Sequence, residues 1–280
     1  MSSGAPLGMF AGGGALPHRI AEAAAATGRS VHVVAIAGFA HAADFAPHRA
    51  IELRFGQAGR ALEWLREGDV REIVMAGTMR RPSLLSLMPD AGGIGILARI
   101  GRAAFRGDDS ILQAVIKVLR EEGMEVIGAQ DVLAGLLPKA GLLAGSVPDD
   151  IARDDIERGI AVATALGAVD VGQSVVVQQG LVLGVEGIEG TDALIARCGE
   201  LRREGPGGVL VKRVKPGQSR LVDLPTIGPR TIAEARAAGL RGVAFEADGT
   251  ILMERAATVA AAEAGGLFLL AFDPANPNQE

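Results

Sequence analysis

The sequence predicts a two-domain α/β protein in which a linker joins an N-terminal Rossmann-like parallel sheet to a C-terminal mixed α/β domain. The chain has 280 residues, which exceeds the usual size of a single core. In the first half, strand patterns alternate with helical patterns, as is typical of a parallel sheet. The segment "GLLPKAGLLAGSVPD" holds two prolines, three glycines and little periodicity. We therefore expect an N-terminal domain over 1–134, a linker over 135–149 and a catalytic domain over 150–280.

The first domain opens with a βαβ pattern. A strand at 7–11 leads through a glycine loop into a helix at about 17–27, which Gly28 closes, and a second strand starts at Val31. The elements expected next are a strand at 50–55, a helix at 58–67, a buried strand at 72–77, helices at 94–105 and 109–122, and a strand at 124–129.

The second domain mixes helices with apolar runs that suggest hairpins as well as crossovers. The elements expected in it are a helix at about 150–166, a hairpin around 179–180, a helix starting near 191, strands at 208–214 and 219–224, a helix at 231–239, a hairpin turning at 248–249 and a final strand at 267–272. Thr231 and Glu234 have the spacing of a capping box. The domain should therefore hold parallel and antiparallel strands together.

Composition excludes several classes of protein. The net charge of −5 argues against a protein that mainly grips nucleic acid, because that requires clustered Lys and Arg. Cys198 is the only cysteine, so no intrachain disulfide can form, and no uncharged apolar run approaches the roughly 18 residues of a membrane span. Four histidines near the N-terminus cannot build H-E-x-x-H. A cytoplasmic protein is expected, and any metal should be bound by oxygen.

The loop "FAGGGALP" lies between the first strand and the first helix, where free backbone N–H groups favour anions. Gly12, Gly13 and Gly14 make it a partial dinucleotide fingerprint. Pro17 stands where the third glycine belongs, and the second strand ends without an acid for a ribose hydroxyl. A dinucleotide oxidoreductase is therefore disfavoured, and glycines that only make a tight turn remain an equal alternative.

The segment "GTMRRP" follows the buried strand at 72–77 and carries Thr78, Arg80 and Arg81. Parallel strands bring their carboxyl ends to one edge of the sheet, which is where such sheets bind ligands. Two guanidinium groups there could hold an anion. Arginines on a solvated loop are the alternative.

Two further segments concentrate carboxylates. "VEGIEGTDA" gathers Glu186, Glu189 and Asp192 around a helix start, where capping explains one acid and a shared cation or substrate could explain the others. In "VDLPTIG", Asp223 ends an apolar run, and the next helix starts only near Thr231, too far for a direct N-cap. Asp223 is thus either an Asx-turn residue or a functional acid.

These motifs, together with "DVGQSVVV" and "KPGQSRLVDLPTIG" and the spacing between them, closely resemble the UDP-2,3-diacylglucosamine pyrophosphatase family of lipid A biosynthesis. The resemblance is to the isozyme that lacks metallophosphoesterase motifs. It covers the chain from Leu7 to about Pro274, and "VDLPTIG" with "EGTDA" is far more specific than a glycine loop.

The resemblance implies Mg²⁺-dependent hydrolysis of UDP-2,3-diacylglucosamine to UMP and 2,3-diacylglucosamine 1-phosphate, in a cleft between the two domains. It assigns metal binding and water activation to Asp223. The residues that it implies for substrate binding are Gly12, Gly13, Gly14, Thr78, Arg80, Arg81, Gln173, Thr191, Asp192 and Gln218. It also implies a homodimer, and a membrane-derived substrate implies peripheral contact with the cytoplasmic face of the inner membrane.

Two other functions compete with this hydrolase. A nucleotide-dependent Rossmann-type enzyme would use the βαβ start, and tight NAD binding would support it. A non-catalytic carrier of lipid or nucleotide would use the same loops but would not depend on Asp223. Replacing that acid therefore separates the carrier from the hydrolase.

Overall fold

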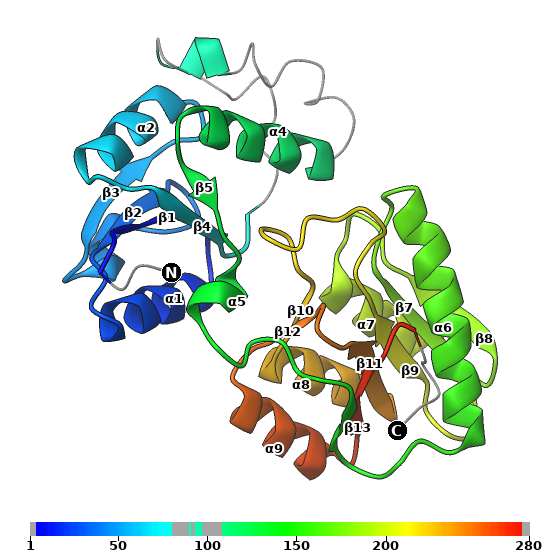
Figure 1. The fold of residues 1–280 in the computed structure, drawn as a ribbon. Coiled ribbons are helices and arrows are strands. Elements are labelled where there is room, and N and C mark those ends of the chain that lie inside the picture. Colours follow the sequence, from blue (N-terminus) through cyan, green and yellow to red (C-terminus); the bar gives the residue numbers. More distant parts are fainter. Residues whose placement is uncertain (1–3, 80–89, 91–92, 97–107, 276–280) are drawn as a thin grey trace. The chain divides into compact units, whose positions relative to one another are not determined.

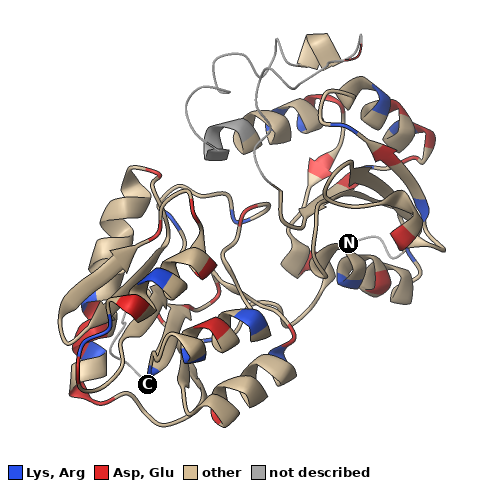
Figure 2. Cartoon of the chain, turned by 180° about the vertical axis from the view of Figure 1, so that it is seen from behind, with Lys and Arg blue, Asp and Glu red and all other residues tan. Residues whose placement is uncertain are grey.

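The computed structural model describes residues 4–79, 90, 93–96 and 108–275, with the backbone alone for 108–111. The chain forms two compact units (Figure 1). The first comprises Met1–Ala134 with Ser219–Asp223, and the second comprises Gly135–Gln218 with Leu224–Glu280. Acidic and basic residues are interspersed in both units (Figure 2).

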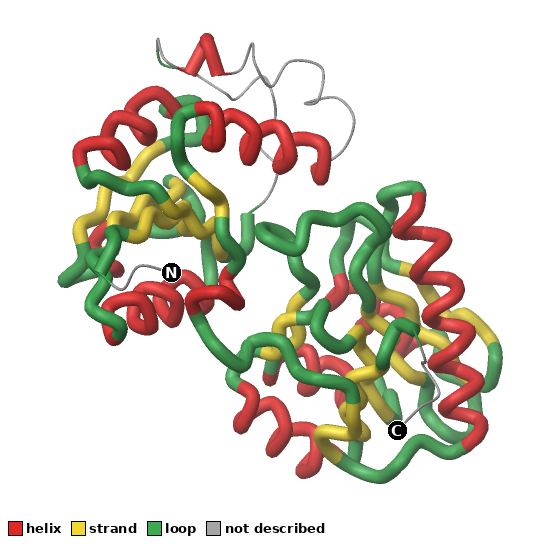
Figure 3. The backbone as a smooth tube through the Cα atoms, in the orientation of Figure 1, coloured by secondary structure: helices red, strands yellow, loops and turns green. Residues whose placement is uncertain are grey.

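The first unit is a Rossmann-like layer structure, as predicted. Its described residues form a parallel five-stranded sheet of order β3-β2-β1-β4-β5. The strands are β1 (Leu7–Ala11), β2 (Val31–Ile36), β3 (Arg49–Leu53), β4 (Glu72–Ala76) and β5 (Glu125–Val126). The helical elements are α1 (Leu16–Ala26), η1 (Ala42–Phe45), α2 (Ala58–Glu67), α4 (Asp108–Glu121) and α5 (Ala129–Val132). Helices cover both faces of the sheet (Figures 1 and 3). Because both faces are covered, β2 is buried along its whole length.

The second unit holds a mixed six-stranded sheet of order β6-β13-β11-β9-β7-β8 within its described residues. The sheet strands are β6 (Gly141–Ala144), β7 (Ser174–Gln178), β8 (Leu181–Val185), β9 (Val209–Lys212), β11 (Gly242–Glu246) and β13 (Phe268–Phe272), and a separate pair is β10 (Thr226–Ile227) with β12 (Ile251–Leu252). The helices are α6 (Asp150–Ala168), α7 (Thr191–Glu200), α8 (Pro229–Ala237) and α9 (Arg255–Gly265). Strands β9, β11 and β13 run parallel, while β6, β7 and β8 supply the antiparallel pairs.

The two faces of this sheet have different cores, and the alternation along β9 assigns its side chains to them. Val209 and Val211 pack with Ile156 of α6, whereas Leu210 packs with Leu194 of α7 on the other face. Successive strand residues point to opposite faces. The next residue, Lys212, therefore lies on the α7 face, at the carboxyl end of β9.

Helix α6 is fixed at its start and in its second turn by carboxylates. Asp149 caps the helix by accepting from the backbone N–H of Ala152, and it also accepts from Arg241. These hydrogen bonds, the one from Arg241 first, hold the pKa of Asp149 below its ordinary value. The buried Asp155 accepts from the backbone N–H groups of Gln179 and Gly180, the two turn residues of the β7–β8 hairpin. The predicted hairpin is present, and α6 holds its turn in place.

The segment expected to be a linker, 135–149, contains a strand. β6 pairs antiparallel with β13 at the edge of the second sheet. The prolines and glycines of this segment indicate turns. They do not prevent the four residues of β6 from pairing at the edge of the sheet. The stretch without regular secondary structure that follows the first unit is therefore shorter than the predicted linker of 135–149.

Three local predictions were wrong. Residues 219–224 do not form a strand; Leu221 and Val222 both pack against the core of the first unit, so their side chains do not alternate between two faces. β11 and β12 do not form a hairpin at 248–249, because each pairs with a different sheet. Helix α8 starts at Pro229, and the Thr231 hydroxyl accepts from the N–H of Gly228, so Thr231 is inside the first turn and is not the cap. The helix predicted at 94–105 lies largely outside the described residues.

Candidate functional site

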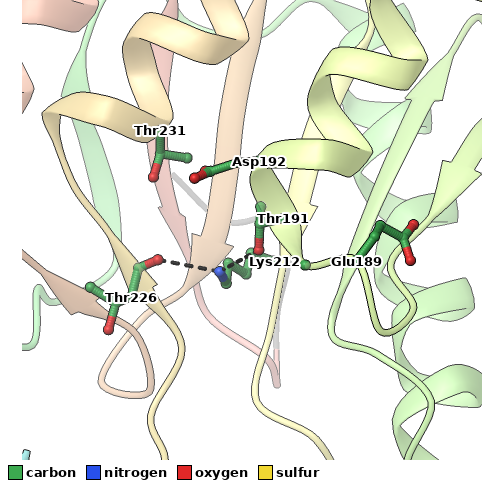
Figure 4. A pocket seen from close by; sticks show the side chains of 7 residues that line it. Glu189, Thr191, Asp192, Lys212, Thr226 and Thr231 are labelled. Carbon is green, nitrogen blue, oxygen red and sulfur yellow. Dashed lines mark hydrogen bonds between the residues drawn. The ribbon is translucent and has the colours of Figure 1, made fainter. Parts of the chain in front are cut away.

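A polar pocket lies in the second unit where β9 ends beside the start of α7. Its volume is about 230 Å³, and its lining consists of Glu189, Gly190, Thr191, Asp192, Lys212, Thr226 and Thr231 (Figure 4). The "EGTDA" motif supplies four of these residues, and the "VDLPTIG" motif supplies Thr226. Two motifs that are distant in sequence thus form one pocket.

Gly190 allows α7 to begin at this place. Its φ of 82° lies in the region that glycine adopts without steric cost, and the helix starts at the next residue, Thr191. Thr191 and Asp192 therefore occupy the first turn, as predicted, and their side chains reach the pocket (Figure 4).

Lys212 is the basic residue of the pocket, and it is 6% exposed. Its ammonium donates to the Thr191 hydroxyl at 2.8 Å and to the backbone carbonyl of Thr226 at 3.2 Å (Figure 4). Both acceptors are in the pocket wall. The sequence-based prediction missed Lys212; its only signal was a charged residue directly after the buried run "VLV".

Glu186 does not line the pocket but is connected to this lysine through Thr191, and it is 7% exposed. One carboxylate oxygen accepts from the Thr191 hydroxyl at 2.7 Å, and the other accepts from the backbone N–H of Gln173 at 3.2 Å. The Thr191 hydroxyl thus connects a buried carboxylate to a buried ammonium.

The register of the sheet brings these groups together. Ser174 of β7 is directly opposite Lys212 of β9, and its carbonyl accepts from the backbone N–H of Glu186, just past the end of β8. The Ser174 hydroxyl also lies 3.3 Å from that of Thr191. Three neighbouring strands thus bring Lys212, Ser174 and Glu186 together, and α7 adds Thr191.

The acids at the rim of the pocket are paired with arginines. Asp192 lies 2.9 Å from Arg230, and Glu189 lies 2.7 Å from Arg197. Hydrogen bonds from the backbone N–H of Glu189 itself and from Arg197 hold the pKa of Glu189 below its ordinary value. The Glu189 side chain lies to one side of the pocket, away from Lys212 (Figure 4).

Comparison with known proteins decides the family. Residues 6–136 match the family model "LpxI N-terminal domain", and residues 139–270 match "LpxI C-terminal domain". The chain belongs to the LpxI family. It is 39% identical over 274 residues to a protein of Caulobacter vibrioides named "UDP-2,3-diacylglucosamine pyrophosphatase LpxI", covering 96% of this chain and 98% of that protein. The family resemblance found in the sequence is confirmed.

In this LpxI chain, the glycine loop and "GT" contact each other through the backbone. Gly13 and Thr78 form an isolated bridge with two hydrogen bonds, of 2.8 and 2.9 Å. A Cβ on Gly12 would lie 2.8 Å from the carbonyl oxygen of Thr78, and Gly77 has a φ of 98°. Close backbone approach thus accounts for Gly12 and Gly77, while Gly14 has open space around it but a φ of 91°, which favours glycine. Arg80 and Arg81 lie outside the described residues.

The two glutamines predicted to bind substrate form hydrogen bonds within the second unit. Gln173 donates through its N–H to Glu186 and accepts through its carbonyl from the N–H of Arg213. The side chain of Gln218 accepts from the N–H of Lys215 at 2.9 Å, which closes the "KPGQ" turn. Neither residue lines the pocket, although Gln173 supports the carboxylate behind it.

Asp223 belongs to the segment Ser219–Asp223 of the first unit. Its backbone N–H donates to the carbonyl of Ser219 at 3.3 Å, so the segment turns where a strand end was expected. Among the described residues of this LpxI chain, no group of three or more His, Cys, Asp or Glu side chains could hold a metal ion. No described helix is both long enough and apolar enough to cross a bilayer.

Proposed function

We propose that the chain hydrolyses UDP-2,3-diacylglucosamine to UMP and 2,3-diacylglucosamine 1-phosphate, as a step in lipid A biosynthesis. The observation that carries this proposal is the 39% identity, over nearly the whole of both chains, to the pyrophosphatase of Caulobacter vibrioides. Water adds to one phosphorus of the diphosphate, the bond from that phosphorus to the bridging oxygen breaks, and a proton is released.

The pocket of the second unit supports this chemistry. The Lys212 ammonium and the side chains of Thr226 and Thr231 line it, and ammonium and hydroxyl groups bind phosphate oxygens. Asp223 precedes Thr226 of the pocket wall by three residues in the sequence. The carboxylate of this residue can hold a cation or accept the proton of the attacking water.

The donor set of the chain fits Mg²⁺. This ion keeps several waters and takes one or two protein carboxylates together with substrate phosphates, so it needs no cluster of acids in the protein. Asp223 would hold it, and the ion would offset the charge that develops on the diphosphate. Lys212 would bind phosphate from the pocket, independently of the ion.

UMP release is expected to require the metal ion. With purified protein and UDP-2,3-diacylglucosamine, we expect UMP to accumulate with Mg²⁺, to stop with excess EDTA and to resume when Mg²⁺ is restored. The control is the melting temperature in EDTA, which should not change if the metal serves the reaction alone. UMP formation that persists in EDTA would contradict the dependence on Mg²⁺.

We propose further that the protein is cytoplasmic, forms a homodimer and contacts the inner membrane peripherally. Ile188, which directly precedes the pocket residue Glu189, is fully exposed and apolar, so its side chain is available to acyl chains. Sedimentation with anionic vesicles tests the contact, and protein that stays in the supernatant would contradict it.

A further inference from the structure

The Thr191 hydroxyl has no capacity left for a ligand. A hydroxyl donates one hydrogen bond and accepts two. The carboxylate of Glu186 can only accept, so at 2.7 Å it takes the proton of Thr191. The ammonium of Lys212 can only donate, so at 2.8 Å it occupies one lone pair, and the Ser174 hydroxyl at 3.3 Å is then a donor to the other.

Lys212 is held in one position by this arrangement. Its four-carbon side chain could adopt many rotamers, but two acceptors, the Thr191 hydroxyl and the Thr226 carbonyl, fix the ammonium in the pocket wall. The proton of Thr191 is directed toward Glu186, so its lone pairs face the lysine. The carboxylate thus determines which way the hydroxyl points and hence where the ammonium lies.

A buried ammonium beside a polar pocket is suited to phosphate. Lys212 and Glu186 are both removed from water, and each forms a hydrogen bond with the Thr191 hydroxyl. The acids at the pocket rim, Asp192 and Glu189, are each paired with an arginine. An incoming phosphate oxygen would therefore meet a cation that is already desolvated and positioned, which strengthens the contact.

We infer that Lys212 binds a phosphate oxygen of the substrate diphosphate, and that Glu186, acting through Thr191, is a positioning residue for this lysine. The inference rests on the proposed function. It gives Thr191 a different role from direct substrate binding, because the hydroxyl is used entirely within the protein. The alternative is that Lys212 serves only as the buried counter-ion of Glu186.

A double-mutant cycle separates these roles. Lys212→Met removes the charge at nearly constant shape, and Thr191→Val removes the hydroxyl. We expect Lys212→Met to lower kcat/KM by about 10- to 100-fold, the range for a lost charge-assisted hydrogen bond. Thr191→Val should lower it by a similar factor, and the double variant should be no worse than Lys212→Met, because both changes remove the same contact.

Two further variants, Thr191→Ser and Lys139→Met, are the controls for this cycle. Thr191→Ser keeps the hydroxyl and should restore most of the activity, and Lys139→Met, at an exposed lysine, should have no effect. Losses that multiply in the double variant would show that Thr191 contacts substrate itself and would overturn the positioning role. If Lys212→Met does not melt cooperatively, Lys212→Gln, which keeps a donor for Thr191, takes its place.

Calorimetric binding of UDP, which carries the same diphosphate, distinguishes failure of this inference from failure of the proposed function. Lys212→Met should weaken UDP binding by about 10-fold or more. If wild type releases UMP from substrate while the variant binds UDP as tightly as wild type, the inference alone fails. If wild type neither binds UDP nor releases UMP, the proposed function fails with it.

Discussion

Asp223→Asn is expected to lower turnover of UDP-2,3-diacylglucosamine by about 10²- to 10⁴-fold, the contribution of a positioned acid–base group, with less than about threefold change in KM. Asparagine has nearly the same shape but neither holds a cation well nor accepts a proton. Initial rates of UMP release, measured over a range of substrate concentrations, check this expectation. The loss should fall on kcat because the acid acts on the reacting atoms.

The matched control is Asp154→Asn, which removes the same charge from an exposed site on α6 and should leave turnover unchanged. An Asp223→Asn variant that keeps wild-type turnover would contradict a chemical role for this acid. It would favour the Asx turn or a carrier function, in which the carboxylate is dispensable.

Gly172→Ala is expected to lower the free energy of unfolding by about 3 kcal/mol and the melting temperature by roughly 5–10 °C. The added Cβ would lie 2.1 Å from the carbonyl oxygen of Glu186, and because that atom belongs to the backbone, no side-chain rotation relieves the clash. Thermal unfolding followed by circular dichroism measures the effect.

The same substitution should also impair the pocket. Moving the backbone at Glu186 separates its carboxylate from the N–H of Gln173 and from the Thr191 hydroxyl, so the loss of activity at a temperature where the variant is folded should resemble that of Thr191→Val. Gly95→Ala is the control, because a Cβ there would meet nothing within 4 Å. A Gly172→Ala variant as stable as Gly95→Ala would show that the backbone yields at this point.

The sequence predicts the first unit well for a physical reason. Strands such as β2 are covered on both faces, so they appear in the sequence as uninterrupted apolar runs. The segments between them show the apolar periodicity of helices. Local patterns of this kind identify an α/β layer structure without any knowledge of distant contacts. The βαβ start and the parallel sheet therefore follow from the sequence.

Elements whose partner lies in a distant part of the chain could not be predicted. The apolar pair Leu221–Val222 resembles part of a strand, but nothing local indicates that it packs against the core of the first unit, whose other residues lie far away in the sequence. Likewise β12 pairs with β10 and not with β11, which precedes it closely in the sequence. Short apolar runs do not encode the choice of partner.

The candidate site divides in the same way. "EGTDA" and "VDLPTIG" were found as motifs, and the pocket contains residues of both. The link from Glu186 through Thr191 to Lys212 depends on the strand order β9-β7-β8, and its hydrogen bond between Thr191 and Lys212 joins residues 21 positions apart. A lysine after a buried strand is usually solvated, so its burial could be learned only from the fold.

Product analysis of the wild-type reaction tests the central claim most directly. Mass spectrometry of a reaction with UDP-2,3-diacylglucosamine should detect UMP and 2,3-diacylglucosamine 1-phosphate in equal amounts, because hydrolysis breaks the diphosphate once. Release of UDP would mean that the bond to the sugar is cleaved, and no product from folded protein with Mg²⁺ would mean that the chain is not this hydrolase; either result would contradict the proposed function.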